Sequence, residues 1–412
     1  MSAQIKFNIQ KKSQGVINIF YIISFQDQLF SFYHDGENII QEKIFPVNNK
    51  KTPPKIIVGD AKKNFSIDII NNQIYLFTQK KSGELFLCLY KNNSWQQKNI
   101  LKQKFNYELK IYPLIQKTNS HQNFFLLYNI PSSEKNNFYI TLSKLQSNHW
   151  QILNQIDKFY DTKNFFIQKL NSHHAIIFYK TKSNSGEINL GYREINSELQ
   201  TDFYNIYSSF QGIPDLNFLT TNNSIHALFI NQNFFTRQLI YKRKQDKFFS
   251  KPITLFQDPN INNPLLLVIK NNLYALWTIN DKIYFCMSNN NGFIFDTPKI
   301  YSSNNFNITK AIYLSDKNQN QKSFFCRELY VNKNCPAEIK FLPDLTDDFF
   351  QTKNFFPESQ EINQIQINKL KNQLNLKNKQ LEIKNKQILD LTNLLKNKNQ
   401  EIISLLNKKN QS

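Results

Sequence analysis

Short runs of apolar residues alternate with polar turns along residues 1–345, in a unit of about 50 residues that recurs along the chain. The polar turn of the unit is an Asn pair, as at Asn71-Asn72, Asn222-Asn223 and Asn271-Asn272, each followed by an apolar run that ends on an aromatic residue. Apolar runs of this length between polar turns are typical of antiparallel strands. A repeat of this period is typical of a propeller or solenoid, and the pattern therefore predicts an all-β repeat domain.

The sixth unit shows the strands best. It predicts strands at Pro264–Ile269, Leu273–Trp277, Ile283–Met287 and Phe293–Ile300. Four strands in one unit form the blade of a β-propeller, whereas a solenoid rung carries fewer. The fold class we predict is therefore a β-propeller of about seven four-stranded blades.

The blade number and the closure of the ring stay open at this point. The last unit, residues 307–345, lacks a full fourth strand, so six blades with an accessory hairpin is the alternative, and a β-sandwich array is a second one. A ring of strands must pair its terminal strands or leave an exposed edge, and Ala3–Ile9 is the candidate closing strand. When the units are counted by their second strands, the second strand of the first unit is predicted at Val16–Phe20.

Turn chemistry supports the strand assignment. The chain has only 8 Gly, although tight β turns need residues that accept positive φ. Asn is the next best residue at such positions, so we expect the Asn pairs to replace Asn-Gly. His34-Asp35-Gly36 is predicted to be a hairpin turn between two strands.

The C-terminal part has a different period. We divide the chain into a propeller at 1–345, a linker at 346–358 and a coiled-coil helix at 359–412, with Ser359 as its N-cap. Apolar residues recur there at strict seven-residue intervals: Ile367, Leu374, Leu381, Ile388, Leu395 and Ile402. Such heptads predict an α-helical coiled coil and homo-oligomerisation, with a dimer favoured.

The heptad register stays open. A coiled-coil interface needs a second apolar position in each heptad, three or four residues after the first, and both choices contain Lys or Asn. A single helix that packs back on the propeller is the alternative.

Charge and cysteine content narrow the class of protein. The net charge of +20 suits nucleic acid, but only four Arg are present and Lys, Asn, Ile, Phe and Tyr are all abundant, as in an AT-rich genome. Nucleic acid is therefore disfavoured as a partner. No apolar stretch reaches 18 residues, so we expect no membrane span and a cytoplasmic protein. Cys88 and Cys286 lie in apolar strand patterns and are predicted to be buried thiols, and no metal or cofactor is expected.

One turn carries a family resemblance. Residues 288–298, SNNNGFIFDTP, resemble a degenerate Asp-box of the sialidase-like (BNR-type) β-propellers. The residues that carry the resemblance are Ser288, Asn290, Gly292 and Phe295, with Asn290 in place of Asp and Phe295 in place of Trp. In such a turn the polar side chain accepts backbone N–H groups and the aromatic ring packs between strands, so it is a structural feature.

The resemblance implies a propeller but not its enzyme activity. Sialidases hold the substrate carboxylate with three arginines, the first in an early blade, and here no Arg precedes Arg193. His226 alternates with apolar residues in a strand and is predicted to be structural, and His173-His174 cannot chelate one metal from a single strand. We therefore assign no catalytic residue, while a glycosidase that uses two carboxylates stays open.

Two functions follow from these observations. The main hypothesis is a non-enzymatic scaffold, whose propeller binds a protein partner and whose tail oligomerises. The alternative is a carbohydrate-binding or carbohydrate-active propeller, for which a glycan is the ligand.

Overall fold

The computed structural model describes residues 20–340 apart from short gaps, together with residues 392, 398 and 399. The gaps are 27, 46–49, 71, 102–105, 118–121, 133–136, 147–148, 161–164, 170–173, 197–200, 222–223, 246–247, 303–306, 317–323 and 333–334. The chain divides into two units, Met1–Phe350 and Gln351–Ser412, and all the described strands lie in the first.

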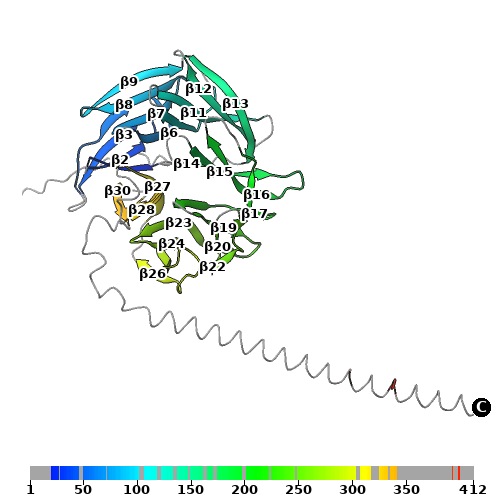
Figure 1. Ribbon diagram of the computed structural model, residues 1–412. Helices are drawn as coiled ribbons and strands as arrows, with labels where there is room; N and C mark the ends of the chain where they lie inside the picture. The colour runs from blue at the N-terminus through cyan, green and yellow to red at the C-terminus, as the bar shows by residue number, and fades with distance from the viewer. Residues whose placement is uncertain are drawn as a thin grey trace, which may run out of the picture. The chain divides into compact units, whose positions relative to one another are not determined.

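Six sheets make up the first unit, and each is built around four consecutive antiparallel strands that form one blade (Figure 1). Blades 1 and 2 are β1 (Phe20–Phe25), β2 (Gln28–His34), β3 (Ile39–Phe45) and β5 (Lys55–Val58), with the short β4 (Lys50–Lys51), and then β6 (Ala61–Ile70), β7 (Gln73–Lys80), β8 (Leu85–Lys91) and β9 (Ser94–Leu101). Blades 3 and 4 are β10 (Ile111–Lys117), β11 (Gln122–Pro131), β12 (Asn137–Gln146) and β13 (His149–Tyr160), and then β14 (Phe166–Lys169), β15 (His174–Lys182), β16 (Ile188–Asn196) and β17 (Tyr204–Ser209). Blades 5 and 6 are β18 (Leu216–Thr221), β19 (Ser224–Gln232), β20 (Arg237–Gln245) and β22 (Ile253–Gln257), with the short β21 (Phe248–Phe249), and then β23 (Ile261–Ile269), β24 (Asn272–Ile279), β25 (Lys282–Ser288) and β26 (Lys299–Ser302).

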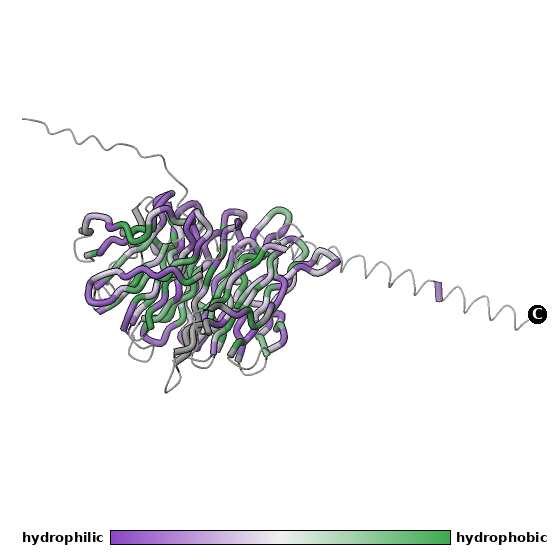
Figure 2. Tube along the Cα trace, turned by 90° about the horizontal axis from the view of Figure 1, so that it is seen from above, coloured by the Kyte–Doolittle hydropathy of each residue, from purple (hydrophilic) through white to green (hydrophobic). Residues whose placement is uncertain are grey.

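Hydrophobic packing between the blades closes the ring. Five buried clusters each join two consecutive blades, from blades 1 and 2 to blades 5 and 6. A further cluster joins blade 6 to blade 1, with Leu267 on one side and Ile22 on the other. Strands buried on both faces explain the nearly continuous apolar runs of the sequence. Figure 2 shows hydrophobic positions within the body of the propeller and hydrophilic ones along its turns and edges.

The structure has six blades, so the expectation of about seven is wrong and the alternative of six is confirmed. The seventh unit does not form a blade of its own. We call residues 308–340 the central segment, with strands β27 (Ile308–Ser315), β28 (Phe324–Cys326), β29 (Glu328–Asn332) and β30 (Cys335–Lys340). Two of its strands pair with strands of the blades, β27 with β1 in parallel and β28 with β23, while β29 pairs with β27 and β30 with β29, so these strands extend existing sheets.

The central segment lies toward the middle of the ring, where β27, β28 and β30 appear in Figure 1. The parallel pairing of β27 with β1 brings together residues nearly 300 positions apart, such as Tyr21 and Ile312. This pairing ties the end of the propeller to its beginning. The other candidate for closure, Ala3–Ile9, lies outside the described residues.

Several local predictions are confirmed. Asn72 and Asn271 have φ of 58° and 68°, so Asn supplies the left-handed backbone that Gly usually provides. His34-Asp35-Gly36 joins β2 to β3, and Gly36 has φ of 110°. Cys88 and Cys286 are buried free thiols in β8 and β25.

Two strand predictions are wrong. The second strand of the first blade is β2, whereas Val16–Phe20 was expected, and Phe20 instead begins β1. The fourth strand of blade 6 starts at Lys299 and not at Phe293, because side-chain hydrogen bonds hold residues 288–296 in a turn.

The linker and the six heptad residues of the tail lie outside the described residues. The three described tail residues, Thr392, Lys398 and Asn399, are helical. The coiled coil and the oligomer stay predictions.

Candidate functional site

The Asp-box-like turn is held by hydrogen bonds from its own side chains. Asn290 Oδ1 accepts the backbone N–H of Ile294 at 2.9 Å and the hydroxyl of Ser288 at 2.8 Å. Ser288 Oγ accepts the N–H of Gly292 at 2.9 Å, and the N–H of Met287 donates to Asp296 Oδ1 at 2.6 Å. All of these polar groups form hydrogen bonds with one another, so their role is to stabilise the local fold of the turn.

The same turn also packs against blade 5. The ring of Phe295 contacts Tyr241 edge-on, with centroids 4.8 Å apart, so the aromatic residue fastens neighbouring blades as well as its own hairpin. Gly292 is required here, because a Cβ at this position would lie 1.8 Å from the Tyr241 hydroxyl oxygen. Tyr241 in turn shares a 2.8 Å hydrogen bond with His226 Nδ1.

His226 is fully buried, in agreement with the structural role predicted for it. Burial, and after it the positive charge of Arg243, lowers its pKa to about 4. The imidazole is therefore neutral at physiological pH, and its two ring nitrogens face Tyr241 and Thr221.

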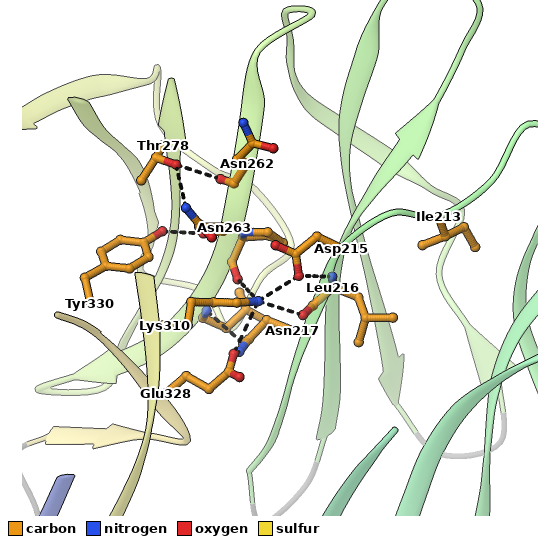
Figure 3. A network of polar contacts seen from close by, with 12 residues as sticks. Ile213, Asp215, Leu216, Asn217, Asn262, Asn263, Thr278, Lys310, Glu328 and Tyr330 are labelled. Carbon is orange, nitrogen blue, oxygen red and sulfur yellow. Dashed lines mark hydrogen bonds and ion pairs between the residues drawn. The ribbon is translucent and has the colours of Figure 1, made fainter. Parts of the chain in front are cut away.

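The centre of the ring holds a network of buried polar groups (Figure 3). Lys310 of β27 lies 2.8 Å from Asp215 Oδ1 and 3.5 Å from Glu328 Oε2, and its ammonium also donates to the carbonyl of Leu216 at 3.1 Å. Glu328 accepts from Asn217 Nδ2 at 2.5 Å, and Asn217 Oδ1 accepts the N–H of Leu266 at 2.9 Å. The network thus ties the central segment to blades 5 and 6.

Two carboxylates, those of Asp215 and Glu328, lie close together at the centre of the ring, and both face the ammonium of Lys310. Burial by itself lowers the pKa of Lys310, yet Asp215 and Glu328 outweigh it and hold the pKa above its ordinary value. An ammonium between two carboxylates is an ion-pair arrangement, whereas glycoside hydrolysis places its two carboxyl groups on either side of the scissile bond. Arg327 lies beside this network, with its guanidinium carbon 5.1 Å from the ring centroid of Phe166 in blade 4. The central segment thus contacts blade 4 as well as blades 5 and 6.

A second polar group lies between blades 4 and 5 and is open to solvent. We call it the Tyr204 site and define it by His174, Tyr192, Glu194, Tyr204 and Lys244. The rings of Tyr192 and Tyr204 are stacked, with centroids 5.2 Å apart and planes 19° apart. Tyr192 is fully buried, whereas Tyr204 at the start of β17 is 44% exposed. The pair therefore presents one aromatic face to solvent.

Charged side chains line the Tyr204 site. Lys244 Nζ lies 5.3 Å from the centroid of Tyr204 and 3.8 Å from Glu194 Oε1, and it also donates to the Tyr192 hydroxyl. His174 Nε2 lies 3.2 Å from Glu194 Oε2. Burial, with smaller effects from Glu194 and Tyr204, raises the pKa of Tyr192, so its hydroxyl stays protonated. The site offers an aromatic face, one carboxylate and one ammonium within a few ångströms.

The Tyr204 site is not evident from the sequence. His174 was expected only as a possible metal ligand, and no sequence pattern marks the other four residues. One local feature could have pointed to it, an aromatic residue at the start of a fourth strand. Tyr204 is the first residue of β17, and Trp95 is the second residue of β9 in blade 2. The difference is packing, because Trp95 is held by Gln41 and Phe32 of blade 1, whereas Tyr204 keeps an exposed face.

The part of the chain that the structure describes contains neither a candidate metal cluster nor a candidate membrane-spanning helix. No group of three or more His, Cys, Asp or Glu side chains there could hold a metal ion. Among the same residues, no helix has the length and apolar character needed to span a bilayer.

Comparison with known proteins gives only distant structural likenesses. No family model matches the chain, and no curated protein matches it. Among solved structures, it is similar to polysaccharide lyase Uly1 (10% identity, covering 72% of this chain and 84% of that one, TM-score 0.46). It is also similar to AofleA from Arthrobotrys oligospora (8% identity, 70% and 87%, TM-score 0.44) and to a mutant of the Aleuria aurantia lectin AAL in complex with Fucalpha1-6GlcNAc (11% identity, 70% and 95%, TM-score 0.43). The strand pairing and the ring of inter-blade cores define the class of this protein, which is a six-bladed β-propeller.

Proposed function

We propose that this protein is a carbohydrate-binding propeller and that the Tyr204 site holds a neutral sugar. The observation that carries the proposal is the exposed face of Tyr204, stacked on Tyr192 and bordered by Glu194 and Lys244. A pyranose ring has a face of C–H groups that packs on an aromatic ring, and hydroxyls that both donate and accept hydrogen bonds. The carboxylate supplies acceptors and the ammonium supplies donors for these hydroxyls.

The charges of the site favour a neutral ligand over nucleic acid. Lys244 is already paired with Glu194, so little net positive charge remains to attract phosphate. An aromatic face would also stack on a nucleobase, but the Glu194 carboxylate beside it repels the phosphate backbone. A sugar without charge meets neither obstacle.

Glycan-array binding of the full-length protein, followed by calorimetry with the best neutral glycan, tests the proposal. Replacing Tyr204 by Ala removes the stacking face and is expected to weaken binding about tenfold or more, whereas Tyr204→Phe keeps the ring and the affinity. Phe248→Ala is the matched control, because Phe248 is 81% exposed on the next blade and outside the site. Equal affinity of Tyr204→Ala and the wild type would place the ligand elsewhere, and absence of glycan binding by the wild type would refute the proposed function.

A protein partner is the second candidate function, and one surface favours it. Phe234 and Phe235, in the turn between β19 and β20, are 82% and 91% exposed, and the neighbouring Phe210 is 70% exposed. A 3.0 Å hydrogen bond from the N–H of Gln232 to the carbonyl of Gly212 holds the two turns together. Clustered exposed aromatic side chains are typical of protein contacts.

Site-specific photocrosslinking from position 234 in cells that produce the protein tests this second function. A crosslinked product that disappears with Phe235→Ser would support it. With such a partner, oligomerisation through the tail would raise the avidity of binding.

A further inference from the structure

Two turns of blades 5 and 6 expose large apolar side chains on the same edge of the propeller. Phe248, just after the turn that follows β20, is 81% exposed, and Phe293 and Ile294 in the turn after β25 are 58% and 71% exposed. We call these three residues the Phe248 edge. They come from two separate hairpins, one in blade 5 and one in blade 6.

Arg243 fixes the two turns relative to each other. Its guanidinium carbon lies 3.4 Å from the centroid of Phe293, and its Nη1 donates to the carbonyl of Asn291 at 3.2 Å. Its backbone N–H donates to Ser250 Oγ, two residues beyond Phe248, at 3.1 Å. The Phe293 ring is therefore held in position before any partner arrives, which lowers the entropy cost of binding.

Lysines accompany the apolar residues. Lys251 lies three residues after Phe248, between β21 and β22, and Lys270 lies in the turn between β23 and β24; both are exposed. The Lys270 turn is on the same edge, because Leu273 pairs with Ser288 at the end of β25. The carboxylate of Asp296, by contrast, is neutralised by Lys299 at 2.7 Å. Among the residues that the structure describes on these turns, the exposed charged side chains are therefore the two lysines, on a chain whose net charge is +20.

We propose that the Phe248 edge docks on the surface of an anionic phospholipid bilayer. Phe248, Phe293 and Ile294 enter the interface, where aromatic and apolar side chains are favoured, while Lys251 and Lys270 face the lipid phosphates. The high exposure of these three apolar side chains and the exposed lysines beside them favour an anionic lipid surface. The proposal does not depend on the Tyr204 site, because it uses other residues.

The docked edge would also place the Tyr204 site near the membrane. Phe249, the residue after Phe248, contacts Tyr192 edge-on at 6.2 Å between centroids. A sugar bound at the Tyr204 site would then lie close to the lipid headgroups.

Vesicle flotation with the full-length protein tests the docking. The probes are vesicles of phosphatidylcholine alone and vesicles of phosphatidylcholine with phosphatidylserine, both free of glycan. The wild type is expected to float with the anionic vesicles, and the triple variant Phe248→Ser, Phe293→Ser, Ile294→Ser to lose about tenfold or more in partitioning. Lys251→Glu with Lys270→Glu is expected to reduce the preference for phosphatidylserine.

The matched control lies at the other end of the same strand. The turn that carries Phe234 and Phe235 precedes β20 and Phe248 follows it, so the two groups are roughly 27 Å apart along a nine-residue strand. Phe234→Ser with Phe235→Ser removes two highly exposed aromatic side chains, 82% and 91% exposed, and is expected to leave flotation unchanged. Thermal unfolding of both variants checks that the fold is intact.

Three outcomes would overturn the proposal. One is a wild type that does not float with anionic vesicles, and another is a triple variant that floats as well as the wild type. The third is a smaller particle mass in light scattering for the triple variant than for the wild type and the control variant. That result would mean that the Phe248 edge binds a second copy of this chain.

Discussion

Lys310→Met tests whether the ion network at the centre holds the propeller closed. Methionine keeps the apolar stem and removes the cation that Asp215 and Glu328 share. The Glu328 side chain is 7% exposed, so its carboxylate would be left buried without a counter-ion, and removing one partner of such a pair costs about 3–5 kcal/mol. The Asp215 side chain is 25% exposed and keeps part of its hydration, so we expect the lower end, about 3 kcal/mol.

Thermal unfolding by circular dichroism measures this effect. For a unit of this size the expected loss corresponds to a fall of about 4 °C in Tm. Lys98→Met is the matched control, because Lys98 is exposed in the outer strand β9 of blade 2. A fall no larger than that of Lys98→Met would refute the argument. In a double-mutant cycle, Glu328→Gln should recover part of the loss, since the carboxylate is then absent too.

The pH dependence gives an independent check of the same ion pair. The pKa of Lys310 is raised on folding, so its contribution to stability is complete below the unfolded value near 10.5. The contribution is lost as the pH rises through the higher folded value. The difference in unfolding free energy between the wild type and Lys310→Met should therefore be constant at neutral pH and shrink only in strong alkali.

Three further predictions concern the turn, the buried histidine and the tail. Gly292→Ala should lower Tm by more than Gly36→Ala, since Gly292 at φ +84° faces Tyr241 whereas Gly36 at φ +110° has open space around it; equal effects would contradict the packing argument. The pKa of His226 is depressed to about 4, so its contribution to stability is present above about pH 6.5 and is lost as the pH falls toward 4, by about 3 kcal/mol in all; in urea unfolding, this acid-sensitive step should be missing from His226→Gln. Ile388→Asp should convert a tail-mediated dimer into a monomer by light scattering, and an unchanged mass would exclude the heptad seam as the interface.

The tyrosines and lysine of the Tyr204 site show why a binding site of this kind escapes sequence reasoning. Tyr192 and Glu194 come from β16, Tyr204 from β17 and Lys244 from the next blade. No fixed spacing relates them, because the register between blades is set by packing and not by local sequence. The one local signal, an aromatic residue near the start of a fourth strand, also occurs at Trp95, where the ring is covered.

The sequence by itself determined the repeat, most of the strands and the Asn turns of this protein. Local rules were sufficient there, because alternation, Asn at positive φ and the self-contained hydrogen bonds of residues 288–296 depend on near neighbours. Only the tertiary structure decided the number of blades and the closure of the ring. The pairing of β27 with β1 and the bond between Lys310 and Asp215 join residues far apart in the chain, and they turn a seventh repeat into the central segment.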